Sequence, residues 1–370
     1  MSIKIGKISG IDIRLHYTWI IVLLMVVWSV GFSYMPLQYP GLDPFRYFLV
    51  GVLSAIIILL SVLFHELCHS IIAKRMGIPV PSIVLFLFGG VSQIAEEPRE
   101  PREEFRMAIV GPISSLLLAG IFAAGWLTLK GKEVTIPAVF QYGFMINLML
   151  GLFNLIPAFP MDGGRVLRAI LWTRSRSLIS ATRKSTFVAE LISYIFMGLG
   201  FLNIFMGSIA NGMWLIFIGW FIKGGAEASL RHTMIAQALA RVKVRDLMSI
   251  PICIASPDWS LEEAVNECFY KYTHGGFPVI EKDELRGILT TEDVRKIPRE
   301  RWKDAKVKEA MTPLRRLITV HPDDPASEAL IKMSKYGVGR LPVLEDGRLV
   351  GIITRSDLMR AVKTRIELAS

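Results

Sequence analysis

Long uncharged runs of apolar residues dominate the first 230 residues of the chain. A run of about 20 apolar residues is long enough to cross the hydrocarbon core of a bilayer as a helix. The first part of this region contains four such runs, at about 17–34, 45–75 and 107–129 and within 134–161. We therefore expect four membrane spans before residue 165.

A further uncharged run, from 191 to 222, is too long for a single span. As one helix it would measure about 48 Å, whereas the hydrocarbon core is about 30 Å thick. Its middle contains four residues that favour a turn: Asn203, Gly207, Asn211 and Gly212. The run therefore predicts two spans, at about 186–206 and 211–230. The expected fold class is a polytopic α-helical membrane protein with six transmembrane helices.

Two segments between the second and third spans depart from this pattern. Residues 79–90 (PVPSIVLFLFGG) are too short to cross a bilayer and are rich in β-forming residues. They predict a short membrane-associated β segment, because exposed backbone at membrane depth must be buried or line a cavity. Residues 96–106 are charged and interrupted by prolines, which predicts a surface loop.

The net charge of +10 first suggests a nucleic-acid partner, but the basic residues lie mostly beside the spans. With the N-terminus in the cytosol, the segments on that side hold fourteen lysines and arginines, and the opposite loops hold three. This is the positive-inside bias of a multi-pass protein of the cell membrane. We expect a cytoplasmic N-terminus and no nucleic-acid partner. The three cysteines, Cys68, Cys253 and Cys268, predict no disulfide framework and fit a reducing cytosolic face.

From about residue 242 the composition becomes that of a soluble α/β domain, and the sequence repeats. Three segments recur 63 or 64 residues later: VRDLM at 244–248 as VKEAM at 307–311, FPVI at 277–280 as LPVL at 341–344, and GILTTED at 287–293 as GIITRSD at 351–357. A duplication of this length indicates two similar modules. The expected domains are a membrane domain at 1–230, a linker at 231–241, and two repeats at 242–303 and 304–370.

His65, Glu66 and His69 form an HExxH pattern at the end of the second predicted span. On a helix, residues i and i+4 share one face, so both imidazoles can reach one metal ion. Glu66 lies one position round from His65, where it can take a proton from an attacking water. Residues 47–64 carry no charge, and an ionisable group inside a span usually marks a pathway or a reaction site. The pattern therefore predicts a metal centre within the thickness of the bilayer.

Asp162 is the expected third metal ligand. It lies in NLIPAFPMDGGR at 154–165, where two prolines and two glycines predict a break of the fourth span near membrane depth. Two histidines, a carboxylate and an open position are the usual plan of a catalytic zinc site. Cys68 is the competing third ligand, and Asp162 would otherwise be a turn or cap residue paired with Arg165. Asn154 would either donate to a developing oxyanion, as a catalytic residue, or satisfy freed backbone carbonyls.

Together these residues resemble the site-2 protease family of intramembrane metalloproteases. The resemblance covers residues 10–230 and rests on four segments: HELCH at 65–69, FGG at 88–90, Gly111-Pro112 and NLIPAFPMDGGR at 154–165. It implies one zinc ion held by His65, His69 and Asp162. It also implies that Glu66 is the general base and that residues 79–90 supply a strand edge for an unwound substrate segment.

The repeated region resembles a pair of CBS (cystathionine-β-synthase) domains over about 242–366. Such pairs commonly bind adenine nucleotides between their repeats, which implies ATP, ADP or AMP as a regulatory ligand and a homodimer through the pair as a further partner. The candidate contacts follow the last strand of each repeat: Thr290 and Asp293 in the first, and Thr354, Arg355 and Asp357 in the second. The second site is the better candidate because Arg355 can pair with a phosphate. The alternative is that threonine and aspartate only cap the following helix.

The sequence therefore predicts an intramembrane zinc endopeptidase that cleaves transmembrane or membrane-associated protein segments near the cytosolic face. This activity is regulated intramembrane proteolysis, and we expect nucleotide at the CBS pair to modulate it. The runner-up is a CBS-gated transporter or channel in which the histidines and Asp162 form an ion pathway, and a third alternative is an inactive scaffold. Transporters usually contain duplicated spans, and the membrane region shows no internal repeat.

The charge bias generates a prediction about topology. A reporter that is active only in the cytosol should be active when fused after Ser370 and silent when fused within 131–136, because six spans return the chain to its starting side. Reporter activity in whole cells, normalised to the amount of fusion protein, is the measurement. The reverse pattern would contradict the predicted orientation.

Overall fold

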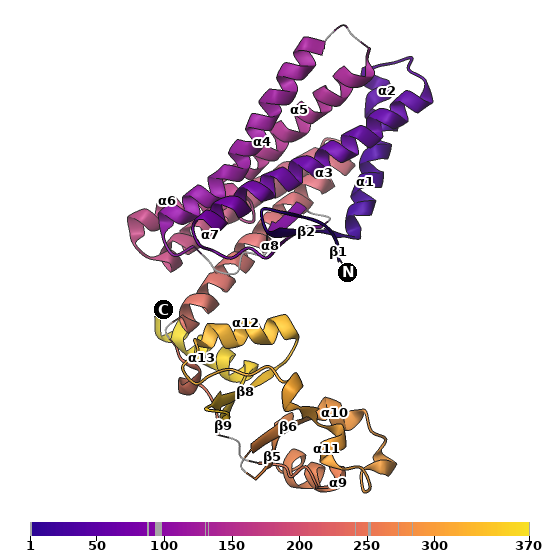
Figure 1. Cartoon of the computed structure of the whole chain (residues 1–370). Helices are drawn as coiled ribbons and strands as arrows, with labels where there is room; N and C mark the ends of the chain where they lie inside the picture. Colours follow the sequence, from indigo (N-terminus) through magenta and orange to yellow (C-terminus); the bar gives the residue numbers. More distant parts are fainter. Residues whose placement is uncertain are drawn as a thin grey trace. The chain divides into compact units, whose positions relative to one another are not determined.

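The computed structural model of the protein describes residues 2–86, 89–92, 98–129, 131, 133–240, 242–250, 253–272, 274–282 and 284–369. The chain divides into two compact units, one ending at Arg231 and one beginning at His232. The first unit contains the long apolar helices, and the second contains the repeated region (Figure 1).

Six helices in the described part of the chain are long and apolar enough to cross a membrane, which confirms the predicted number of spans. The first consists of α1 (Thr18–Trp28), the π-helical turn η1 (Ser29–Tyr34) and α2 (Met35–Gln38). The other five are α3 (Pro44–Arg75), α4 (Pro101–Leu129), α5 (Thr135–Asn154), α7 (Leu178–Phe205) and α8 (Ile209–Leu239).

The predicted break in the long uncharged run is a tight turn between α7 and α8. Gly207 in this turn has a φ of +88°, a left-handed conformation that carries no steric penalty in the absence of a side chain. Two other glycines let the helices approach closely. A Cβ on Gly200 would lie 2.7 Å from the carbonyl oxygen of Gly212, and a Cβ on Gly212 would lie 2.5 Å from that of Gly200.

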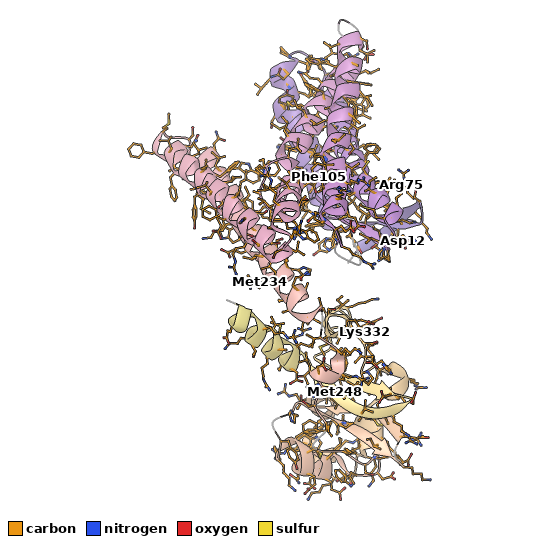
Figure 2. The ribbon with its side chains drawn as sticks, turned by 90° about the vertical axis from the view of Figure 1, so that its left-hand side faces the viewer. Asp12, Arg75, Phe105, Met234, Met248 and Lys332 are labelled. Atoms are coloured by element: carbon orange, nitrogen blue, oxygen red, sulfur yellow. A yellow bond between two sulfur atoms is a disulfide. The ribbon has the colours of Figure 1, made fainter. Side chains whose placement is uncertain are left out.

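Small residues also set the packing of α4 on α5, which lie side by side in Figure 1. The ring of Phe140 occupies the space beside Gly125 on α4, and the ring of Phe122 occupies the space beside Gly143 on α5. The side chains that project outward from the long helices are almost entirely carbon in Figure 2, where Phe105 marks α4. Glycine inside and large apolar residues outside is the distribution expected of helices that pack in lipid.

A four-stranded sheet accompanies the helices, in the order β1 (Ser2–Ile8), β2 (Ile11–His16), β3 (Ser82–Phe86) and β4 (Gly89–Ser92). β2 and β3 pair in parallel, and the outer pairs are antiparallel. The predicted extended segment at 79–90 is therefore present as β3 and the start of β4, although residues 87–88 lie outside the described residues. The sequence did not predict the N-terminal hairpin, in which Ile11 and Ile13 are buried.

The predicted surface loop at 96–106 is wrong for its second half, because α4 begins at Pro101. Proline suits the first turn of a helix, where its missing N–H would have no partner, and acidic residues there favour the positive end of the helix dipole. One of these acidic residues, Glu104, is completely buried. Residues 96–97 lie outside the described residues. A further helix that the sequence did not predict, α6 (Asp162–Ser175), connects α5 to α7.

The second unit contains two similar halves. Helices α9 (Leu261–Ala264) and α12 (Ala326–Tyr336) each precede an antiparallel pair of strands and a helix. The strand pairs are β5 (Gly276–Glu281) with β6 (Glu284–Thr290), and β8 (Arg340–Glu345) with β9 (Arg348–Thr354). The following helices are α10 (Thr291–Arg295) and α13 (Arg355–Ala369), and α11 (Val307–Ala310) begins the second half.

Each half receives the leading segment of the other. Ser249, from the start of the first repeat, exchanges two backbone hydrogen bonds with Ile352 of β9. In the same way, Thr312 of β7 (Thr312–Pro313), from the start of the second repeat, pairs with Ile288 of β6. The buried core of the second half therefore contains Val244, which lies in the first repeat by sequence.

Two further features of the second unit concern predictions from the sequence. Cys253 and Cys268 form a disulfide, so the prediction that the chain has none is wrong. The count of cysteines could not reveal this pair, because a 15-residue segment folds back to bring their Cα atoms within 5.8 Å. The predicted linker at 231–241 is largely helical, since α8 continues to Leu239.

Candidate metal centre

The residues of the predicted metal site converge on one point. His65 and His69 lie one turn apart on α3, and Asp162 is the first residue of α6. The Oδ2 atom of Asp162 lies 3.0 Å from Nε2 of His65 and 3.1 Å from Nε2 of His69. Among the described residues these three form the cluster of ligand atoms able to hold a metal ion, all within 4.8 Å of one another. Both histidines are at most 5% exposed.

The local sequence explains how Asp162 reaches the histidines. α5 ends at Asn154, and the irregular segment 155–161 folds tightly against the first turn of α6. A Cβ on Gly163 would lie 2.3 Å from the carbonyl oxygens of Leu155 and Ile156, and one on Gly164 would lie 2.5 Å from the backbone of Ala158. Both glycines are helical residues of α6. They are therefore required because a side chain would not fit against the segment 155–161, and not because they end a helix.

One face of α4 completes the site from the opposite side. The carbonyl oxygen of Met107 lies 2.6 Å from Nδ1 of His69, and Oγ of Ser115 lies 2.8 Å from Nδ1 of His65. Between them, Gly111 leaves the space that the imidazoles occupy, because a Cβ there would lie 2.1 Å from Nε2 of His69. The sequence prediction missed Met107 and Ser115. The spacing of 107, 111 and 115, which places one face of α4 toward the site, is the signal that could have found them.

This set of donors fits a divalent cation. A backbone carbonyl can only accept, so the hydrogen bond to Met107 places the proton of neutral His69 on Nδ1. Its Nε2 then presents a lone pair to the carboxylate of Asp162 at 3.1 Å, which is unfavourable unless a cation lies between them. Two imidazoles and one carboxylate, with the second imidazole nitrogen of each histidine fixed by a hydrogen bond, are typical of zinc sites.

The other candidate residues of the sequence analysis lie outside this cluster. Glu66, on α3, lies against β4, where a Cβ on Gly90 would be 2.3 Å from its Cγ. The Nδ2 atom of Asn154 donates to the carbonyl of Leu150 at 2.9 Å, which is the backbone role considered from the sequence. Cys68 is a free, half-buried thiol outside the metal-binding cluster of the described residues.

The alternative structural role of Asp162, as a cap residue paired with Arg165, is not what the structure shows. Its carboxylate faces both histidines, and Nε of Arg165 instead lies 3.9 Å from a carboxylate oxygen of Glu104. The cap position before α6 is occupied by Met161.

The candidate nucleotide residues form matching caps in the two repeats. The hydroxyl of Thr290 donates to Asp293 at 2.6 Å, and that of Thr354 donates to Asp357 at 2.6 Å. In each pair the backbone N–H of the aspartate also donates back to the threonine hydroxyl. Arg355 is exposed at the start of α13. The capping role is therefore present in both repeats, and nucleotide binding by these residues stays a prediction.

Comparison with known proteins identifies both units. Residues 53–136 and 130–200 match the model of peptidase family M50, and residues 244–300 and 307–364 match that of the CBS domain. Zinc metalloprotease MJ0392 of Methanocaldococcus jannaschii is 31% identical over 98% of this chain and 96% of its own length. The chain belongs to the M50 family of site-2 proteases. It is a zinc metalloprotease with a C-terminal pair of CBS domains, which resolves the choice against a transporter.

Two solved structures are similar to parts of this metalloprotease. The site-2 protease from M. jannaschii is 31% identical, with a TM-score of 0.43, and the match covers 62% of this chain and 94% of that one. The CBS domain pair of protein MJ0100, in complex with 5′-methylthioadenosine and S-adenosyl-L-methionine, is 32% identical with a TM-score of 0.31. That match covers 34% of this chain and 98% of the other.

The space beside Gly111 generates a prediction about metal binding. Gly111→Ala should lower zinc affinity at least about tenfold although no ligand is removed, because the new methyl group would displace His69. Competition against a chromophoric chelator measures the affinity. Gly120→Ala, on the same helix with no atom within 4 Å of the added Cβ, is the matched control. Equal affinities for the two variants would show that the site tolerates a side chain at 111.

Proposed function

We propose that this metalloprotease cleaves membrane-embedded segments of protein substrates within the bilayer, near its cytosolic face. The observation that carries the proposal is the position of His65 and His69, which are buried on one of the six apolar helices. α3 carries no charged side chain from Tyr47 to Phe64, so the ligands follow directly on a stretch suited to lipid. The charge bias of the loops supports a cytosolic side for this end of α3.

The residues around the site account for peptide hydrolysis. His65, His69 and Asp162 would hold the zinc ion, which would supply Lewis-acid activation of the attacking water and of the substrate carbonyl. Glu66 takes a proton from the attacking water and returns it to the leaving amine. Ser115 and the carbonyl of Met107 hold the imidazoles in the orientation that presents Nε2 to the site.

The sheet offers a way to hold a substrate that has left its helix. Within the described residues β4 is an edge strand, and Gly90 on β4 lies against Glu66. A substrate segment in extended form could add to this edge through backbone hydrogen bonds. Such pairing would free a carbonyl from its helical hydrogen bond and bring it beside the general base. Membrane-anchored regulatory proteins are the substrate class that the family suggests.

Regulation by the CBS pair is the second part of the proposal. The last turns of α8 contribute Leu239 to the core of the CBS unit, while Ile222 and Ala226 of the same helix pack with Phe159 and Met161. Phe159 and Met161 lie in the segment that leads to Asp162. A ligand that changes the conformation of the CBS pair can therefore alter α8 and, through it, the metal site, by a coupling of about 1–3 kcal/mol.

The roles of Glu66 and Asp162 are separable by mutation. Glu66→Gln should keep zinc and lose nearly all hydrolysis, because the amide removes the base and leaves the ligands. Asp162→Ala should lose zinc affinity itself by about tenfold or more. Zinc content and cleavage of a membrane-embedded peptide, both measured on protein reconstituted in liposomes, test the two roles.

Either of two results would contradict these assignments. Zinc that is lost with Glu66→Gln would make the glutamate a ligand instead of a base. Full zinc occupancy of Asp162→Ala at low free zinc would mean that another residue is the third ligand. Cys68 would then be the next residue to mutate.

Nucleotide control predicts an effect of mutation in the cap of the second repeat. ATP or AMP should change the cleavage rate about 5- to 150-fold in the full-length protein. Asp357→Ala should remove most of this nucleotide-dependent change in cleavage rate, because it alters the proposed site beside Arg355. Arg360→Gln is the control, since it changes an exposed residue of the same helix, α13, outside the candidate contacts. A constant rate across millimolar nucleotide in the wild type would exclude this regulation.

A further inference from the structure

A buried ion pair that the chemistry does not use lies next to the metal site. Glu104 on α4 has no exposed surface, and Arg168 on α6 is 5% exposed. Nε of Arg168 donates to Oε1 of Glu104 at 2.7 Å, and Nη2 bonds the same oxygen. Burying two charges costs much of what their attraction returns, so stability alone is a weak explanation for the pair.

Arg168 connects the segments on both sides of Asp162. It lies on the second turn of α6, six residues after the ligand. Its guanidinium group also lies 5.3 Å from the centre of the ring of Phe159, three residues before the ligand, in the geometry of a cation–π contact. One side chain thus holds together the helix that begins with Asp162 and the segment that leads to it.

Glu104 is a residue of α4, the helix that orients the histidines. Positions 104, 107, 111 and 115 are three or four residues apart, so they follow one face of α4. Three of these positions contact the imidazoles, as the carbonyl of Met107, the space at Gly111 and the hydroxyl of Ser115. The fourth position, Glu104, reaches α6 instead. The ion pair therefore fixes the distance between the helix that orients two ligands and the helix that carries the third.

We propose that Glu104 and Arg168 are positioning residues that hold the Asp162 carboxylate within ligating distance of His65 and His69. This inference rests on the assignment of Asp162 as a metal ligand. Neither residue touches the substrate or the metal, and both act through the placement of α6. Loss of the pair should therefore weaken metal binding and alter the geometry of the ligands before it affects the binding of substrate.

The test compares metal binding in variants of the full-length protein in detergent. Glu104→Gln/Arg168→Met removes both charges together, which avoids leaving one of them buried and unpaired. We expect its zinc affinity to fall about 10- to 100-fold, as for other groups that orient metal ligands. The visible absorption of the cobalt-substituted protein should change in shape, because cobalt reports the geometry of its ligands. Arg174→Gln, an exposed arginine on the same helix, should match the wild type in both measurements.

Three outcomes are informative, provided that the thermal unfolding midpoint shows a folded variant. Weaker zinc with an altered cobalt spectrum supports the positioning role. Wild-type zinc affinity and an unchanged spectrum, with only a lower midpoint, would reduce the pair to a contribution to folding and overturn the inference. If Asp162→Ala also retains wild-type zinc affinity, the ligand assignment itself has failed. Arg168→Lys provides a further check, because it keeps the charge but loses the forked geometry, and should recover part of the affinity.

Discussion

A reaction site inside an apolar helix bundle depends on hydrogen-bond partners for its buried imidazole and guanidinium groups. Water cannot supply missing hydrogen bonds there, and an unpaired buried group costs several kcal/mol. The face of α4 from 104 to 115 meets this demand with a carbonyl, a hydroxyl and a carboxylate, directed to His69, His65 and Arg168. Removing one partner of a buried ion pair costs about 3–5 kcal/mol, so this face is constrained for the stability of the bundle as well as for its chemistry.

The candidate metal ligands could be predicted from the sequence because their chemistry is unusual in its setting. Charged and imidazole side chains within long apolar runs stand out, and the i, i+4 spacing of His65 and His69 specifies one helical face. Asp162 was recognisable from the prolines and glycines around it. The partners of the imidazoles were not, because serine, glycine and a backbone carbonyl are ordinary inside a span. Their role depends on which face of α4 meets α3, and that is a property of the tertiary packing.

For the fold, too, features set by local sequence could be predicted, and features that depend on distant contacts could not. Hydropathy predicted six spans because length and lack of charge are local properties, and the turn at Gly207 followed from residue type. The start of α4 was missed because its charged first turn looks like a loop until Glu104 is seen to be buried. The N-terminal hairpin was missed because its partner strand, β3, lies about seventy residues away along the chain. The Cys253–Cys268 bond was missed for the same reason of non-local proximity.

The exchange of leading segments between the CBS repeats has a consequence for how this region can change in evolution. Residues 242–249 complete the second half, and residues 305–313 complete the first half. A deletion of either repeat would leave the survivor with an unpaired strand edge and an incomplete core, and exposed edges of this kind promote aggregation. The two repeats should therefore be inherited, lost or transferred to other proteins as one cassette. Within that cassette the sequences remain free to diverge, so that one half can specialise for a ligand while the other serves as its scaffold.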